Sequence, residues 1–277
     1  MTATVFILVL CAAALHAGWN VVVKSAGDTF VTAVAICFSA ALVAALVLPF
    51  IAQPAAASWP YLGASMLLQT AYYALVAAAY QRADMSLVYP LMRGTAPMMV
   101  AVISALALGE VLPLAGWIGV GLISGGILSM ALFGHGGRRD GMGLALLNAV
   151  VIATYTLNDG WGARASGAPV SYSLWVSLLT APPVLIWALV QRGPAIMPAV
   201  ASRWRTGLIG AVGSMTSYAV ALWAMTRAPV ALVAALRETS ILFATIISVL
   251  VLGEKVGKGR ILAVAIIVAG AAALRLA

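Results

Sequence analysis

Ten apolar runs follow one another along the chain, and each has about the length that a helix needs to cross a lipid bilayer. A spanning helix takes about 20 apolar residues, and the polar breaks between the runs are short. Runs of this length indicate helices rather than barrel strands, because backbone groups in hydrocarbon must bond within their own segment. The sequence therefore predicts an all-α integral membrane protein with spans at about 3–23, 30–50, 60–81, 86–108, 114–133, 142–163, 168–190, 206–226, 230–252 and 259–276.

The composition excludes soluble and disordered classes of protein. Apolar residues make up 64% of the 277 residues and charged residues 8%, against roughly 45–50% and about 25% in soluble domains. The net charge is +8, but no basic run marks a nucleic-acid-binding face, so we expect no nucleic-acid partner. Cys11 and Cys37 both lie inside apolar runs, so we expect no disulfide framework, no metal site and no cofactor. The first run is expected to be a retained helix rather than a signal peptide, since the first basic residue is Lys24.

The second half of the chain repeats the first at a distance of 144 residues. The matching pairs include Arg93 with Arg237, Thr95 with Thr239, Ser104 with Ser248, Gly109 with Gly253 and Glu110 with Glu254. Chance similarity between apolar helices would match Leu, Val and Ala, but not Arg, Thr and a Gly-Glu pair in register. We therefore predict two five-helix repeats, residues 1–135 and 142–276. Five crossings make the second repeat enter from the opposite side, so the repeats are inverted, which in transporters places the substrate between them near the midplane.

The basic residues are distributed unequally between the two sets of loops. Loops after even-numbered spans, with the C-terminus, hold Arg164, Arg227 and Arg275. Cytoplasmic loops carry an excess of Lys and Arg, so the richer set is expected in the cytoplasm and both termini on the opposite side. The richer set, after odd-numbered spans, is Lys24, Arg82, Arg138, Arg139, Arg192, Arg203, Arg205, Lys255, Lys258 and Arg260.

Two segments of the chain resemble the fourth and ninth helices of EamA domains. They are Leu87–Leu112, LVYPLMRGTAPMMVAVISALALGEVL, and Leu232–Val256, LVAALRETSILFATIISVLVLGEKV. The segments His16–Asp28 and Ala153–Gly167 are similar to the starts of the two domains in one EamA subgroup. The resemblance implies a member of the drug/metabolite transporter superfamily, with ten helices in two inverted EamA repeats around a central cavity. It also implies transport of a small polar metabolite, often export, as in amino-acid exporters of this architecture; other branches carry sugar phosphates, nucleotide sugars or drugs.

Four charged residues are expected inside the membrane. Arg93 and Arg237 lie several residues inside their helices, Glu238 follows Arg237, and Asp159 lies near one end of the sixth helix. A charge at the bilayer centre costs at least about 2.5–3.5 kcal/mol, and such residues tend to face a cavity. Pro97 cannot donate to the carbonyl of Arg93, which indicates a polar pocket at that depth. We predict that both Arg side chains bind the solute, because a guanidinium binds a carboxylate through two hydrogen bonds; the alternative is that they reach the headgroups.

Polar and aromatic side chains on further helices are candidate walls of the same site. His16, Trp19 and Asn20 share one helix face, because residues three and four apart are neighbours on a helix. The predicted solute-binding residues are Trp19, Asn20, Gln69, Tyr72, Tyr73, Tyr89, Arg93 and Arg237, and those with a coupling or structural role are His16, Asp159 and Glu238. The alternatives are an interfacial aromatic belt and, for His16 and Glu238, structural hydrogen bonds.

Prolines and small residues predict two further features. Pro182–Pro183 is expected to break the seventh helix near its middle. Gly121 and Gly125 form a GxxxG pattern that Ala265 and Ala269 repeat. This pattern predicts close packing by the fifth and tenth helices, which then form a scaffold or a dimer contact.

These features predict a secondary transporter that moves a small polar metabolite, an amino acid or related solute, across the cytoplasmic membrane by alternating access, with export as the expected direction. Its expected partners are the solute and the lipid bilayer, with the chain as a monomer or a homodimer. One alternative is an integral membrane enzyme acting on a lipid or isoprenoid substrate. Such an enzyme needs a clustered His/Asp set or a metal motif, whereas the two histidines and seven acidic residues are scattered. A channel is a third alternative, against which the broken helices and paired Arg residues count.

The charge asymmetry of the loops predicts the orientation of the chain. A cysteine placed at Gly137, in a variant without Cys11 and Cys37, is expected to be protected from an impermeant thiol reagent in intact cells, because this loop is predicted to be cytoplasmic. The same cysteine should react once the cells are permeabilised. Labelling in intact cells would show that the orientation is reversed.

Overall fold

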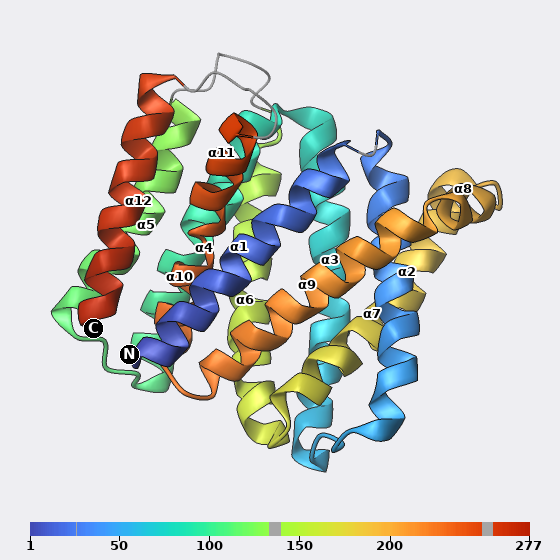
Figure 1. Cartoon of the computed structure of the whole chain (residues 1–277), viewed down its shortest axis with the longest axis horizontal. Helices are drawn as coiled ribbons and strands as arrows, with labels where there is room; N and C mark the ends of the chain where they lie inside the picture. The colour runs from blue at the N-terminus through green and yellow to red at the C-terminus, as the bar shows by residue number, and fades with distance from the viewer. Residues whose placement is uncertain (26, 133–139, 251–256) are drawn as a thin grey trace.

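The computed structural model of the chain describes residues 1–25, 27–132, 140–250 and 257–277. Every regular element in this part of the chain is a helix (Figure 1). Ten segments, with α10 and α11 taken as one, are long and apolar enough to cross a membrane, which confirms the predicted all-α fold. The long helices are α1 (Ala3–Ser25), α2 (Thr29–Val47), α3 (Trp59–Arg82), α4 (Met85–Leu108), α5 (Leu114–Leu132), α6 (Met142–Ser166), α7 (Pro169–Arg192), α9 (Trp204–Met225), α10 (Val230–Arg237), α11 (Ser240–Leu250) and α12 (Lys258–Leu276), and the short ones are η1 (Leu48–Phe50), η2 (Ala56–Ser58) and α8 (Ile196–Ser202).

Several helix ends follow from capping residues in the sequence. Asp28 precedes α2 in an extended conformation, and its carboxylate accepts hydrogen bonds from the backbone N–H groups of Phe30 and Val31, as an N-cap residue does. Gly109 and Gly167 end α4 and α6 with φ angles of 62° and 64°. Glycine adopts this left-handed conformation without the steric cost of a Cβ atom. The caps allow one span to end and the next to begin within a few residues.

The ninth span is broken, and the seventh is not. α10 ends at Arg237, Glu238–Thr239 form a turn, and α11 begins at Ser240. α7 runs without interruption through Pro182–Pro183, so the break predicted there is wrong. Each proline removes one helical N–H donor, but a full break would leave more backbone groups unbonded in hydrocarbon, where no water replaces the lost partners. The helix therefore continues through both prolines.

A helix pair that packs together across the two halves recurs as a second pair, in which each helix is replaced by its counterpart from the other half. α3 packs against α6 and α9 packs against α1, while α4 packs against α6 and the α10–α11 pair packs against α1. α5 lies along α12 (Figure 1), and α2 packs against α7. A two-fold relation between two five-helix units requires this exchange. One pair departs from it, because α4 packs along α5 whereas α11 has few contacts with α12.

α5 and α12 approach each other closely through glycines. A Cβ atom on Gly119 would lie 3.0 Å from the carbonyl oxygen of Gly270, and one on Gly270 would lie 2.9 Å from that of Gly119. Among the described residues, no heavy atom of another segment lies within 4 Å of the corresponding positions on Gly121 and Gly125. The close contact therefore does not use the predicted pair. Gly121 is two residues, and so about 200° around the helix, from Gly119.

The ends of the helices gather on two sides of the molecule. α1, α3 and α7 end toward one side, where α2, α4 and α9 begin, and both termini lie at the opposite side (Figure 1). On the first side the carboxylate of Asp28 pairs with Arg192. On the side of the termini Arg275 donates to the backbone oxygen of Met1. The assignment of the first side to the cytoplasm stays a prediction. Three basic residues on which it depends, Arg138, Arg139 and Lys255, lie outside the described residues, as does the labelling position Gly137.

The pair of Asp28 and Arg192 predicts a pH-dependent stability. The hydrogen bond from Arg192, with those from the backbone of Val31 and Phe30, holds the pKa of Asp28 below its usual value. A lowered carboxyl pKa contributes stability above the ordinary value of about 3.9, and this stability is lost as the pH falls through the folded-state pKa. Asp28→Asn, which retains an N-cap side chain, is expected to lower the unfolding midpoint by about 1–3 °C near pH 7 and by progressively less as the pH falls below about 3.9. Arg192→Gln should have a smaller effect in the Asp28→Asn background than alone; equal effects would contradict the pairing.

Candidate functional site

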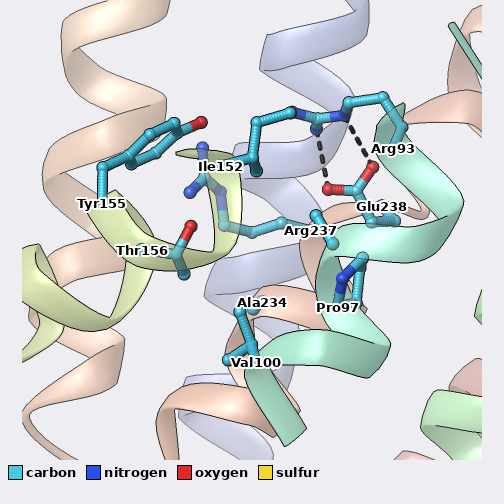
Figure 2. Close-up of a pocket in the computed structure, with 10 residues that line it drawn as sticks. Arg93, Pro97, Val100, Ile152, Tyr155, Thr156, Ala234, Arg237 and Glu238 are labelled. Atoms are coloured by element: carbon cyan, nitrogen blue, oxygen red, sulfur yellow. Dashed lines mark hydrogen bonds and ion pairs between the residues drawn. The ribbon is translucent and has the colours of Figure 1, made fainter. Parts of the chain in front are cut away.

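A buried ion pair joins the two halves of the chain at the centre of the helix bundle. Arg93 of α4 donates from Nε to Oε2 of Glu238 and from Nη2 to Oε1, each at 2.8 Å (Figure 2). Only 9% of Arg93 and 6% of Glu238 is exposed. Two parallel bonds of this kind are a strong geometry between guanidinium and carboxylate. The Nε–Nη2 edge of Arg93 is therefore occupied by the protein itself.

The turn between α10 and α11 gives two consecutive residues different directions. Glu238 points toward Arg93, whereas Arg237 extends across the neighbouring pocket toward Tyr155 (Figure 2). The guanidinium carbon of Arg237 lies 5.3 Å from the centre of the Tyr218 ring, which is a cation–π distance. Among the described residues no hydrogen bond or ion pair to the Arg237 guanidinium is present. Its N–H donors are therefore available to a ligand.

Both arginines and Glu238 line a small pocket between α4, α6 and α10 (Figure 2). The pocket measures about 10 Å³, roughly the space of a single water molecule. In this conformation it is too small for an organic solute. The remaining wall residues are Ala96, Pro97, Val100, Ile152, Tyr155, Thr156 and Ala234.

Asp159 of α6 forms a second polar centre, one helical turn beyond Tyr155 and Thr156. It is completely buried, and its carboxylate accepts hydrogen bonds from five neutral side chains. These donors belong to α3, α6, α7 and α9, so one carboxylate ties four helices together. Oδ1 accepts from Tyr172 at 3.0 Å and Asn158 at 3.1 Å, and Oδ2 accepts from Ser65 at 3.0 Å, Gln69 at 3.4 Å and Tyr218.

Three of the predicted aromatic and amide residues lie close to these two centres. Gln69 donates to Asp159. Tyr72 lies edge-on to Tyr155, with ring centres 5.9 Å apart. Tyr89 lies on α4, at the edge of the largest apolar cluster. None of the three lines the pocket itself in this conformation.

Three other predicted solute-binding residues, Trp19, Asn20 and Tyr73, do not line the pocket. Tyr73 packs in an apolar cluster that includes residues of α2 and α7. Trp19 contacts His16, with ring centres 5.1 Å apart, and lines an apolar groove of about 480 Å³ between α1 and α9. Asn20 donates to the backbone oxygen of His16. The structure therefore does not bring these side chains to Arg237 in this conformation.

Three residues around the pocket are not among the predicted ones. Tyr155 and Thr156 share the α6 face of Asp159, because residues three and four apart are neighbours on a helix. Helical spacing counted from Asp159 therefore indicates that Tyr155 and Thr156 lie on the same face as this carboxylate. Tyr218 corresponds in the repeat register to Ala74, which gives no signal for a polar residue there.

Arg164 is expected in a loop, but it lies in the last turn of α6. It donates to Glu110 at 2.9 Å and to the backbone oxygens of Met225 and Ala228 at 2.8 and 3.1 Å. A loop of only Gly167 and Ala168 separates α6 from α7, so the helix extends further than the apolar run indicates. Arg164 therefore ties three segments together on the side of the termini.

Comparison with known proteins gives the family and supports the fold. The profile of the EamA-like transporter family matches residues 3–132 and again residues 139–276, which confirms the resemblance to EamA domains. A solved structure described as "Crystal structure of protein" is similar over 100% of this chain and 98% of its own, with a TM-score of 0.78 and 20% sequence identity. At this identity the likeness shows the fold. No curated protein sequence matches. With ten apolar helices long enough to cross a membrane in its described part, the chain is a multi-pass membrane protein.

The buried ion pair predicts that neither partner can be neutralised alone without a loss of stability. Arg93→Gln leaves Glu238 without its cation, and Glu238→Gln leaves Arg93 without its anion. Removing one partner of a buried pair costs roughly 3–5 kcal/mol, so each single variant is expected to unfold at a clearly lower temperature in detergent. The double variant should lose less stability than the sum of the two single losses. Strictly additive losses would contradict the direct pair.

Proposed function

We propose solute transport as the function of this chain, which belongs to the EamA-like transporter family. In this proposal the chain is a secondary transporter of a small organic solute with an acid group, an amino acid or a related metabolite. It carries the solute across the cytoplasmic membrane by alternating access, in the export direction. The family is one of transporters, which favours this function over that of a membrane enzyme acting on a lipid.

The free guanidinium of Arg237 is the observation that carries the proposal. An arginine without a direct anionic partner is costly to hold inside a membrane, and such residues mark substrate sites and pathways. Its planar set of N–H donors fits a carboxylate. Arg93, the corresponding residue of the first repeat, already binds Glu238. The acid group of the solute is therefore assigned to Arg237, and Arg93 supports the site.

The charges at the centre favour a solute without net charge. Arg93 and Arg237 are balanced in number by Glu238 and Asp159. A solute that is only an anion would leave one excess negative charge in a region of low dielectric, which is unfavourable. A zwitterion adds a carboxylate and an ammonium together and leaves the balance unchanged. The hydroxyl of Thr156, in the same pocket, is an acceptor for the ammonium.

The ion pairs at both sides of the molecule fit a transporter that is closed in this conformation. Arg164 and Glu110 join segments on the side of the termini, and Asp28 and Arg192 join α2 to α7 on the opposite side. In each pair at least the arginine is more than a third exposed. Exposed pairs contribute only about 0.2–1 kcal/mol, so either side can open at modest cost. Alternating access requires one side to open while the other stays closed.

Neutralising Arg237 is expected to weaken solute binding without unfolding the protein. The purified protein is reconstituted in proteoliposomes and screened for uptake and counterflow of amino acids and related carboxylates. For the solute that is transported best, Arg237→Gln should raise KM by roughly 10- to 150-fold, which corresponds to the loss of a charged hydrogen-bond pair of about 1.5–3 kcal/mol.

Arg227→Gln is the matched control for this experiment. Arg227 also lies over an aromatic side chain of α9, 5.9 Å from the Trp223 ring, but it is exposed and does not line the pocket. The control variant should keep the wild-type KM. A wild-type KM for Arg237→Gln would overturn the assigned site, and a screen in which no solute is transported would overturn the proposed function.

A further inference from the structure

Arg237 has no hydrogen-bonded anion among the described residues, because the carboxylate beside it is shared with Arg93. Two acidic residues, Asp159 and Glu238, lie inside the spans that the structure describes. Both oxygens of Glu238 bind Arg93. Asp159 therefore remains as the anion that can balance Arg237, although the two side chains do not touch.

One tyrosine contacts both of these charged groups. Arg237 lies over the ring of Tyr218, at 5.3 Å from its centre. The hydroxyl of the same tyrosine donates a hydrogen bond to Oδ2 of Asp159. Arg237 of α10, Tyr218 of α9 and Asp159 of α6 thus form an unbroken series of contacts, from the cation through the aromatic ring and its hydroxyl to the carboxylate.

The five donors around Asp159 fit the ionised form of its carboxylate. An ionised carboxylate only accepts hydrogen bonds, and it has about four lone-pair sites on its two oxygens. Five neutral donors fill these sites, so Asp159 has no free position for a guanidinium. The carboxylate is held in place by these donors and has no direct contact with Arg237.

We propose that Asp159 is the remote counter-ion of Arg237 and acts through Tyr218, which leaves the guanidinium N–H groups free for the solute. The availability of these N–H groups to a solute rests on the proposed function, whereas the charge coupling does not. Asp159 and Tyr218 are positioning residues in this arrangement, since neither has to touch the solute.

The hydrogen bond of Tyr218 strengthens the contact that holds Arg237. A phenol that donates its proton toward a carboxylate gains electron density, because neighbouring hydrogen-bonded groups polarise one another. The face of the ring then attracts a cation more strongly. The charge of Asp159 is thereby transmitted to the place where Arg237 lies.

A direct ion pair would stabilise Arg237 but would remove its binding capacity. Arg93 shows this case, because its Nε–Nη2 edge is closed by Glu238. A tyrosine between the two charges stabilises the guanidinium through the face of its ring and leaves the N–H donors unused. The two arginines that the repeat aligns therefore have different roles.

A double-mutant cycle without any solute tests this coupling. Asp159→Asn also disturbs hydrogen bonds to its neutral donors, so its effect is measured in two backgrounds. The variant should lower the thermal unfolding midpoint by roughly 5 °C in the wild-type background. In the Arg237→Gln background the same change should lower the midpoint by less than half as much, because no cation is left uncompensated.

Two controls separate charge coupling from a purely structural role of Asp159. Arg164→Gln removes a cation near the end of the same helix that binds other partners, and its effect should add to that of Asp159→Asn. Tyr218→Phe keeps the aromatic ring but removes the hydroxyl bond to Asp159, and it should reduce the coupling between positions 159 and 237. If Asp159→Asn alone does not yield folded protein, Asp159→Asn/Arg237→Gln should restore the yield.

Additive losses at positions 159 and 237, or no rescue of yield by the double variant, would overturn the counter-ion role. Full coupling in the Tyr218→Phe background would overturn the part assigned to Tyr218. The failures of the two proposals are distinguishable. Coupling without transport of any carboxylate contradicts the proposed function alone, and a raised KM in Arg237→Gln without coupling contradicts the counter-ion alone.

Discussion

A charged side chain inside hydrocarbon is stable only if the protein itself supplies its counter-charge or its hydrogen bonds, and this requirement organises the centre of the molecule. Glu238 reaches Arg93 from a turn that interrupts the ninth span, and the same turn directs Arg237 to a different neighbour, Tyr218. Irregular backbone at membrane depth is tolerated where protein surrounds it. The turn fulfils that condition, since Glu238 and Thr239 are both buried.

A single position accounts for much of the difference in helix packing and charge between the two halves of the chain. In the repeat register, Gly94 corresponds to Glu238. A Cβ atom on Gly94 would lie 2.8 Å from Cγ of Leu128, so α4 needs glycine there in order to pack along α5. The second half has a glutamate at this position, and α11 packs along α1 rather than along α12. The first half thus uses the position for close packing, and the second half uses it for the charge that holds Arg93.

The sequence predicts what depends on local pattern. The spans follow from apolar runs, the repeat from a constant offset, and the burial of Arg93 from its depth in its run. The partner of Arg93 is indicated only weakly by the sequence. A buried arginine needs an anion nearby. Glu238 adjoins Arg237, which the repeat places at the same depth as Arg93. The donors of Asp159 come from four helices, and no pattern within one helix indicates that they meet. The uninterrupted helix at Pro182–Pro183 likewise depends on the surroundings of the backbone rather than on its residues.

The same electrostatic requirement limits how the pocket can open. A space of about 10 Å³ admits an organic solute only if α4, α6 and α10 separate. Separating α4 from α10 would break the pair of Arg93 and Glu238, at roughly 3–5 kcal/mol. α6 meets the pocket through uncharged side chains, among them Tyr155, so its displacement is less costly. α4 and α10 are therefore expected to move as one body relative to α6. Since Asp159 lies on α6, a displacement of α6 relative to α10 changes the distance between Asp159 and Arg237.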